Sequence, residues 1–135
     1  MKYYLAKTDP ETYSIDDLER DKQTEWDGVH NPTAVIFLRH MKAGDRVLIY
    51  HSQGQASIVG LAEVVGEGHD DPNDKRTYLQ EFKFIRKFKE PYVTLPQIKA
   101  TGLFPNFRLV RQSRLSTMDV PEEFISWLKK QGVEV

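Results

Sequence analysis

Hydrophobic residues recur along the chain at spacings that predict several short strands. In residues 78–88, aromatic side chains fall on even positions and charged side chains on odd ones, the two-residue period of a strand with one buried face. Apolar runs at 3–7, 46–51 and 57–65 predict three further strands, the last apolar enough to be buried on both faces. Residues 114–120 are expected to form the final strand.

Three- and four-residue spacings, together with capping residues, predict short helices between these strands. Residues 32–41 are expected to be helical, because their apolar side chains share one face and Asn31 followed by Pro32 is suited to begin a helix. Ser14 and Asp17 resemble a capping box at another helix start. The remaining helix boundaries are Thr94 and Pro121 at the starts and Gly102 and Gly132 at the ends.

Three polar stretches separate these elements. Residues 19–25 are rich in charge and expected to be exposed, and residues 66–75 are expected to form a polar loop, whereas residues 106–112 fit neither a helix nor a strand clearly. Because strands outnumber helices and the helices fall irregularly between them, the pattern favours the α+β class. We expect a curved, mostly antiparallel sheet or small barrel flanked by short helices, in one domain that spans residues 1–135.

Composition narrows the classes of protein further. Hydrophobic residues make up 39% of the chain and charged residues 29%, and no apolar run approaches the roughly 20 residues needed to cross a bilayer, so no membrane partner is expected. The absence of cysteine excludes disulfides and thiolate chemistry, and with no secretory pattern at the N-terminus we expect an intracellular, cytoplasmic protein. A net charge of −1 indicates that any nucleic acid is bound weakly or through a local basic patch.

The segment from Trp26 to Pro32 is the first candidate for a binding site. Trp26 and Asp27 are expected on a tight bend that leads into the helix after Asn31, where backbone amides favour electron-rich groups. An aromatic plate beside such donors is suited to hold a flat polar ring. The alternative is that Trp26 fills the core and Asp27 completes the turn.

Two other groups of polar residues are candidates. Tyr50, His51 and Ser52 end an apolar strand with three hydrogen-bonding side chains, which suits a polar ligand, although Tyr50 can also be half-buried while the other two begin a turn. Arg108, Arg111 and Arg114 recur at three-residue intervals and form either a phosphate-binding patch or a solvated edge.

Motifs for catalysis and for metal binding are missing. The histidines have no zinc-ligand spacing, and the chain contains neither a phosphate-binding glycine loop nor a nucleophile elbow. Ser52, His51 and Asp27 could form a triad only on paper, because neighbouring residues at a strand end point to opposite sides. We therefore predict a protein that is not an enzyme, with no cofactor and no metal.

Several motifs in order resemble the EVE domain family, which is PUA-like and related to the YTH and SRA readers of methylated bases. The most specific is Trp26-Asp27-Gly28-Val29. The chain differs from the family pattern just after it, where His30 replaces an arginine and Ala34-Val35-Ile36 replaces Ala-Arg-Asn. The other matching segments are residues 4–10, 13–18, 41–45, 50–52, 58–60 and 111–116.

This resemblance implies a PUA-like fold and a non-catalytic reader of a modified base, a modified cytosine such as 5-methylcytosine in DNA. We expect a monomer whose partner is nucleic acid, with an RNA reader and a nucleoside-binding or small-molecule-binding module as the alternatives. Arg111 and Arg114 are the expected phosphate contacts. By analogy with the related readers, and with Asn31 added beside the bend, the expected base pocket consists of Lys7, Thr8, Trp26, Asp27, Asn31, Tyr50, His51 and Ser52.

Overall fold

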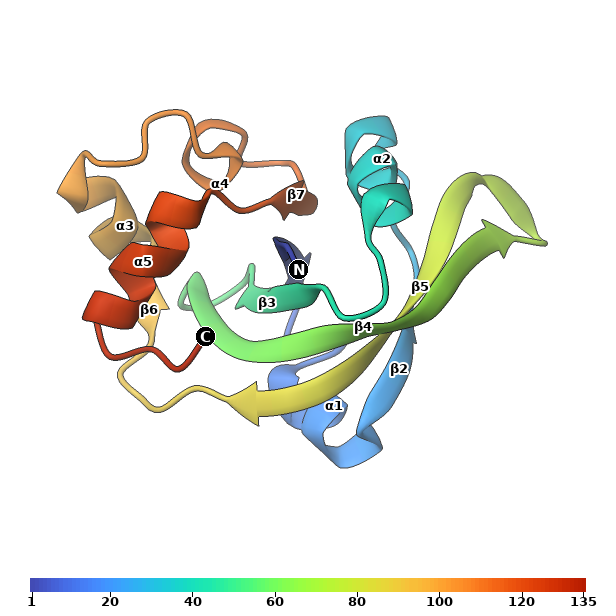
Figure 1. Ribbon diagram of the computed structural model, residues 1–135, viewed down its shortest axis with the longest axis horizontal. Coiled ribbons are helices and arrows are strands. Elements are labelled where there is room, and N and C mark those ends of the chain that lie inside the picture. The colour runs from blue at the N-terminus through green and yellow to red at the C-terminus, as the bar shows by residue number, and fades with distance from the viewer.

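The computed structural model describes residues 1–135 and contains one seven-stranded sheet with five helices around it (Figure 1). The strand order is β2-β5-β4-β3-β1-β7, and β6 pairs with β4. The strands are β1 (Tyr3–Thr8), β2 (Gln23–Trp26), β3 (Arg46–His51), β4 (Ser57–Asp71), β5 (Asp74–Lys87), β6 (Val93–Thr94) and β7 (Thr117–Asp119). The helices are α1 (Ile15–Asp21), α2 (Pro32–His40), α3 (Leu95–Thr101), α4 (Arg108–Arg111) and α5 (Glu122–Lys130).

The sheet is antiparallel except where β1 lies parallel to β3. This arrangement confirms the α+β class and the mostly antiparallel sheet. Figure 1 shows β4 bending along its length, and the pairing of β4 with β5 shifts register at Leu61/Ala62 and again between Val65 and His69. Such bulges add twist and bend a strand, which explains the curvature.

The prediction of a polar loop at residues 66–75 is wrong, because most of this stretch is strand. The β4–β5 pairing continues through His69, opposite Leu79, to the tip of the hairpin, where Asp71 pairs with Asp74. Figure 1 shows this hairpin projecting from one end of the molecule, away from α3 and α5 at the other. A projecting ribbon is exposed to water along much of its length, so backbone pairing can form it with few apolar residues.

The expected exposure of residues 19–25 is confirmed for all of them except the half-buried Thr24, although they belong to regular elements, since α1 extends to Asp21 and β2 begins at Gln23. β2 is an edge strand that pairs with β5, and only Trp26 among its residues is buried. An edge strand with a single buried side chain lacks the repeated alternation that identifies strands in a sequence. The two-residue β6 and the four-residue α4 are too short to show any hydrophobic period and were missed, and β7 is shorter than the predicted strand at 114–120.

Capping residues place the helices where the sequence predicted them. Ser14 and Asp17 form a reciprocal capping box at α1, and the Asn31 side chain accepts hydrogen bonds from the first backbone amides of α2. Thr94 caps α3, and Gly102 ends it in the left-handed conformation at a φ of 66°. Each cap satisfies amide or carbonyl groups that a helix end leaves without a partner.

One cluster of 32 buried residues forms the core between the sheet and the helices. Phe82 from β5 and Phe124 from α5 are its largest fully buried side chains. Gly60 in β4 allows close packing, because a Cβ there would lie 2.3 Å from Ile15 Cδ1 and 2.9 Å from the Arg86 carbonyl oxygen. None of the helices is both long and apolar enough to cross a bilayer.

Candidate functional site

A cavity of about 470 Å³ opens beside Trp26, where β1, β2 and three loops meet. β1 contributes its last two residues and β2 its last three, and the segment that follows β2 leads on towards α2. Gly28 has a φ of 74°, which allows the chain to turn away from β2 at this point. The lining residues are Lys7, Thr8, Thr12, Tyr13, Thr24, Glu25, Trp26, Asp27, Gly28, Val29 and Ser116.

Trp26 belongs both to the core and to the wall of this cavity. Its side chain is 7% exposed, and its ring centroid lies 5.0 Å from that of Phe82 at an interplanar angle of 31°. Tyr13 packs edge-on at 6.2 Å. Phe82 therefore covers one broad face of the indole, and a ligand in the cavity can reach only the parts of the ring that these two aromatic residues leave uncovered.

The polar groups around the cavity differ in whether they already form hydrogen bonds or ion pairs within the protein. Lys7 Nζ donates a hydrogen bond to the Ser113 carbonyl at 2.9 Å, and burial lowers the pKa of this amine. The Thr8 hydroxyl donates to the Tyr13 carbonyl at 2.7 Å. Glu25 lies 3.4 Å from His69 Nε2. Asp27, in contrast, is exposed and forms no hydrogen bond or ion pair through its side chain, so its carboxylate is free to accept from a ligand.

The structure brings together four of the predicted base-pocket residues, Lys7, Thr8, Trp26 and Asp27, around this one cavity. The other four do not line it. Contacts with neighbouring backbone and core hold them elsewhere.

His51 Nε2 accepts a hydrogen bond from the Ile15 backbone amide at 3.1 Å, and burial is the main cause of its lowered pKa. Its imidazole thus satisfies one of the free amides at the start of α1. Tyr50 is only 2% exposed, with Lys7 Nζ 5.6 Å from its ring centroid. Ser52 donates to the Thr8 carbonyl at 3.4 Å. These three side chains stabilise the strand ends that surround the cavity.

A second hollow of about 430 Å³ lies at the start of α2 and holds the fourth of these residues, Asn31. The predicted phosphate contacts Arg111 and Arg114 line it together with Asn31, Thr33, Gln112, Ser113 and Leu115. Lys7 connects the two hollows, because its amine reaches Ser113 while its backbone amide donates to the Ser116 carbonyl at 2.8 Å.

Unlike most arginines of the chain, Arg111 and Arg114 form no ion pair. Both are exposed and have no carboxylate partner. Five other arginines form ion pairs with carboxylates, namely Arg20, Arg39, Arg76, Arg86 and Arg108. An unpaired guanidinium at the rim of a hollow can bind a phosphate without first breaking an ion pair.

Sequence reasoning missed Thr12, Tyr13, Thr24 and Ser116 as lining residues. Thr24 had a usable signal, because it lies two residues before Trp26 and so faces the same side of β2. Tyr13 and Ser116 had none, since β1 and β7 stand at the opposite end of the strand order from β2 and reach it only because the sheet curves round. No group of three or more His, Cys, Asp or Glu side chains is arranged to hold a metal ion.

Comparisons with known proteins agree with this architecture. The family model described as "EVE domain" matches residues 2–131. Thymocyte nuclear protein 1 of Rattus norvegicus is 32% identical over 157 aligned positions, which cover 90% of this chain and 69% of the relative. The human protein of the same name is 30% identical over the same shares of the two chains.

Solved structures give the same result in three dimensions. The protein Rpa0253 from Rhodopseudomonas palustris is 32% identical and superimposes with a TM-score of 0.88 over 98% of this chain and 93% of its own. Human THYN1, solved in complex with DNA that contains 5-methylcytosine, is 26% identical, with a TM-score of 0.84 over 95% of each chain.

Proposed function

Because the chain belongs to the EVE domain family, we propose that it binds nucleic acid carrying a modified base and holds that base in the cavity beside Trp26. The proposed ligand is a 5-methylated cytosine in DNA. One observation carries the proposal: four residues that sequence reasoning assigned to a base pocket line a single cavity, in a fold shared with a protein solved in complex with such DNA.

The size and lining of the cavity suit a single base. A volume of about 470 Å³ lies within the range typical of small-molecule sites, about 300–1,000 Å³. Asp27 is a free acceptor, and a carboxylate suits the exocyclic amino group of cytosine, which is a donor. Val29 and the uncovered part of the Trp26 ring offer apolar surface to a methyl group. A base with a carbonyl in place of the amino group would leave Asp27 facing an acceptor.

The second hollow would hold the phosphates beside the bound base. Arg111 and Arg114 are unpaired there, and Lys7 connects this hollow to the cavity. With a net charge of −1 and few free cations at the site, the domain would contact few phosphates. The base must also leave the stack to enter the cavity, and this costs least where it is already unpaired.

We further propose that the domain binds without catalysing a reaction. His51 accepts from the Ile15 amide, and Ser52 donates to the Thr8 carbonyl, so the two polar side chains suited to nucleophilic chemistry are engaged with the backbone. Neither lines the cavity beside Trp26. A nucleophile must have its base within hydrogen-bond reach and must itself be accessible to substrate.

Fluorescence anisotropy with single-stranded oligonucleotides tests the proposal directly. One oligonucleotide carries a single 5-methylcytosine, a second carries cytosine at that position, and a third is the RNA equivalent of the first. We expect the methylated DNA to bind more tightly than either of the others. Equal affinity for methylated and unmethylated DNA would contradict the proposed ligand.

A matched pair of variants tests the cavity. Asp27→Asn keeps the shape of the side chain but replaces one acceptor oxygen by a donor, so binding of methylated DNA should weaken about 5- to 30-fold, the range for roughly 1–2 kcal/mol. Glu19→Gln makes the same chemical change on the exposed surface of α1 and serves as the control. If both variants bind like the unchanged protein, Asp27 does not contact the base.

The near-neutral charge favours one other candidate, a domain that binds a free nucleoside. Affinity for a nucleic-acid strand falls steeply as salt increases, whereas affinity for an uncharged nucleoside changes little. Titrating the methylated oligonucleotide and 5-methyldeoxycytidine at several salt concentrations therefore separates the two candidates.

A further inference from the structure

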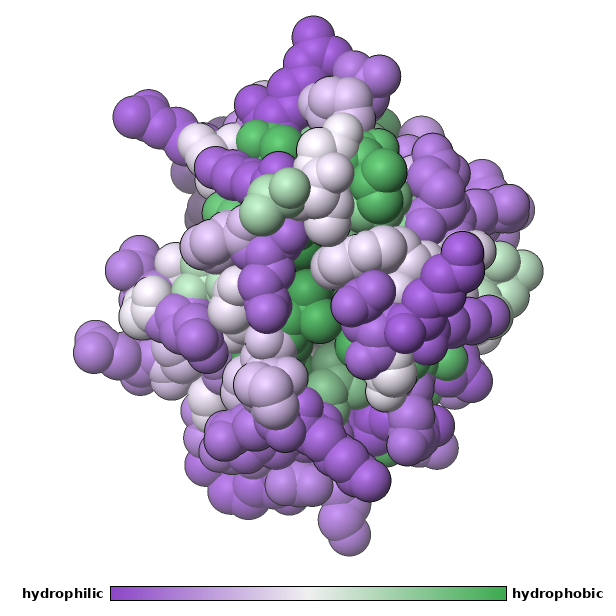
Figure 2. Space-filling view, turned by 90° about the vertical axis from the view of Figure 1, so that its left-hand side faces the viewer, coloured by the Kyte–Doolittle hydropathy of each residue, from purple (hydrophilic) through white to green (hydrophobic).

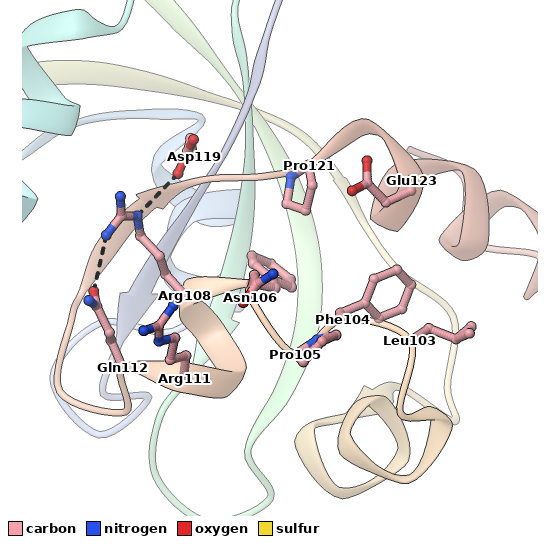
Figure 3. A pocket seen from close by; sticks show the side chains of 11 residues that line it. Leu103, Phe104, Pro105, Asn106, Arg108, Arg111, Gln112, Asp119, Pro121 and Glu123 are labelled. Carbon is pink, nitrogen blue, oxygen red and sulfur yellow. Dashed lines mark hydrogen bonds and ion pairs between the residues drawn. The ribbon is translucent and has the colours of Figure 1, made fainter.

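A third hollow, of about 340 Å³, lies between α4 and the start of α5 (Figure 3). It shares two of its lining residues, Arg111 and Gln112, with the hollow that contains Arg114 and Asn31. Along the chain segment from Asn106 to Ser116, the three hollows therefore follow one another, and the cavity beside Trp26 is the last of them.

The walls of this third hollow combine an apolar surface with polar side chains. Leu103 is 62% exposed and is one of only three large hydrophobic residues exposed on the molecule. Pro105, also exposed, continues this apolar surface, and Asn106 follows it with an amide that can both donate and accept. Figure 2 shows that hydrophilic side chains cover most of the face where α3 and α5 lie and surround a smaller hydrophobic area.

The charged side chains of the hollow are not all available to a ligand. Arg108 lies 3.6 Å from the Asp119 carboxylate and donates to Gln112 at 3.4 Å, as Figure 3 shows. Arg111 remains unpaired, but Glu123 also faces the hollow. With one free guanidinium balanced by one free carboxylate, the hollow is poorly suited to a bare phosphate. It is better suited to a flat, uncharged group that lies on Leu103 and Pro105.

We infer that this hollow binds the base of a nucleotide adjacent to the modified one. This inference rests on the proposed function and extends it from a single base to a short unpaired strand. The modified base occupies the cavity beside Trp26, and the phosphate that joins the two nucleotides and the next one along the strand lie over Arg111 and Arg114. The neighbouring base packs on Leu103 and Pro105, with its edge at Asn106. A duplex would keep this base stacked and paired, so the inferred partner is single-stranded or locally opened DNA.

Abasic substitution tests the inference, because it removes a base and keeps the sugar and phosphates. The probe is a short single-stranded DNA with one central 5-methylcytosine. Three forms of it are compared: one with an abasic site directly 5′ of the modified base, one with an abasic site directly 3′ of it, and one with neither. Loss of the base on one side should weaken binding about 5-fold, the effect of roughly 1 kcal/mol from covering part of the exposed apolar surface of Leu103. The other side should matter much less.

Two variants locate this effect on the protein. Leu103→Ser removes the apolar surface at an exposed position. The abasic penalty, which is the fold loss of affinity when the neighbouring base is removed, should therefore fall towards one. Ile36→Ser is the matched control, since Ile36 is also an exposed hydrophobic residue, at 51%, but lies on α2 outside this hollow. In the control the penalty should stay as it is in the unchanged protein.

The outcomes separate this inference from the proposed function. If methylated DNA binds tightly but neither abasic site weakens it, the neighbouring-base site is overturned and the base pocket stands. A penalty that persists in Leu103→Ser would also overturn it. If the methylated and unmethylated oligonucleotides bind equally and the one-sided penalty remains, the proposed function is wrong and the hollow binds an unmodified base.

Discussion

Replacing Arg111 and Arg114 with glutamine should reduce the salt dependence of DNA binding by a predictable amount. Both guanidiniums are exposed and unpaired beside one hollow, so each is free to neutralise one phosphate. Arg20 on α1 is the matched control, because Asp17 already holds its guanidinium at 3.0 Å. Arg20→Gln removes the same charge from the protein but no expected phosphate contact.

The magnitude follows from counterion release. For single-stranded DNA, the slope of log affinity against log salt changes by about 0.7 for each phosphate contact. The double variant should therefore have a slope shallower by about 1.4. Between about 50 and 200 mM salt, the unchanged protein should lose about sevenfold more affinity than the double variant. The control should keep the slope of the unchanged protein, because a slope counts contacts rather than net charge.

The assay is anisotropy of a labelled, methylated single-stranded oligonucleotide at four or more salt concentrations, with circular dichroism to show that each variant is folded. A double variant whose slope matches that of the unchanged protein would refute the assignment of these two arginines. An equal reduction in the Arg20→Gln control would refute the reasoning itself, since general electrostatic attraction would then explain the effect.

The other predictions concern the stability that supports the cavity. Trp26→Ala should lower the free energy of unfolding by about 3–5 kcal/mol, because the indole packs on Phe82 in the core, and urea denaturation will measure it. Gly60→Ala should cost about 1–3 kcal/mol in the same assay, since its Cβ would lie 2.9 Å from the Arg86 carbonyl oxygen; an unchanged midpoint would show that the backbone adjusts freely. Burial holds the pKa of the His51 imidazole below its usual 6.5 in the folded protein. As the pH falls, the unfolded chain therefore binds a proton at His51 before the folded protein does. Stability should therefore fall as the pH drops below about 6.5, and less steeply in His51→Asn, when unfolding is measured at several pH values.

The sequence predicted most of the elements through signals that act over a few residues. Asn31 and Ser14 identify helix starts because a cap satisfies amides two or three residues away. The alternation in residues 78–88 identifies β5 because Phe82 lies in the core while Lys83 and Lys87 stay exposed. The same reasoning failed for the projecting hairpin and for β2, where backbone pairing holds segments that bury little apolar surface.

The candidate site likewise has one part that the sequence predicted and one part that it did not. Its residue types were predictable, because Lys7, Thr8, Trp26 and Asp27 lie in two short motifs that resemble those of one family. The cavity itself was not, since β2 lies at one end of the strand order and β1 and β7 at the other, and only the curvature of the sheet brings Ser116 and β1 to within reach of β2. Tertiary contacts also decided that His51 supports α1 instead of facing a ligand. A local pattern is set by neighbouring residues, whereas a cavity is the space left when segments more than a hundred residues apart pack together, as the Lys7–Ser113 hydrogen bond shows.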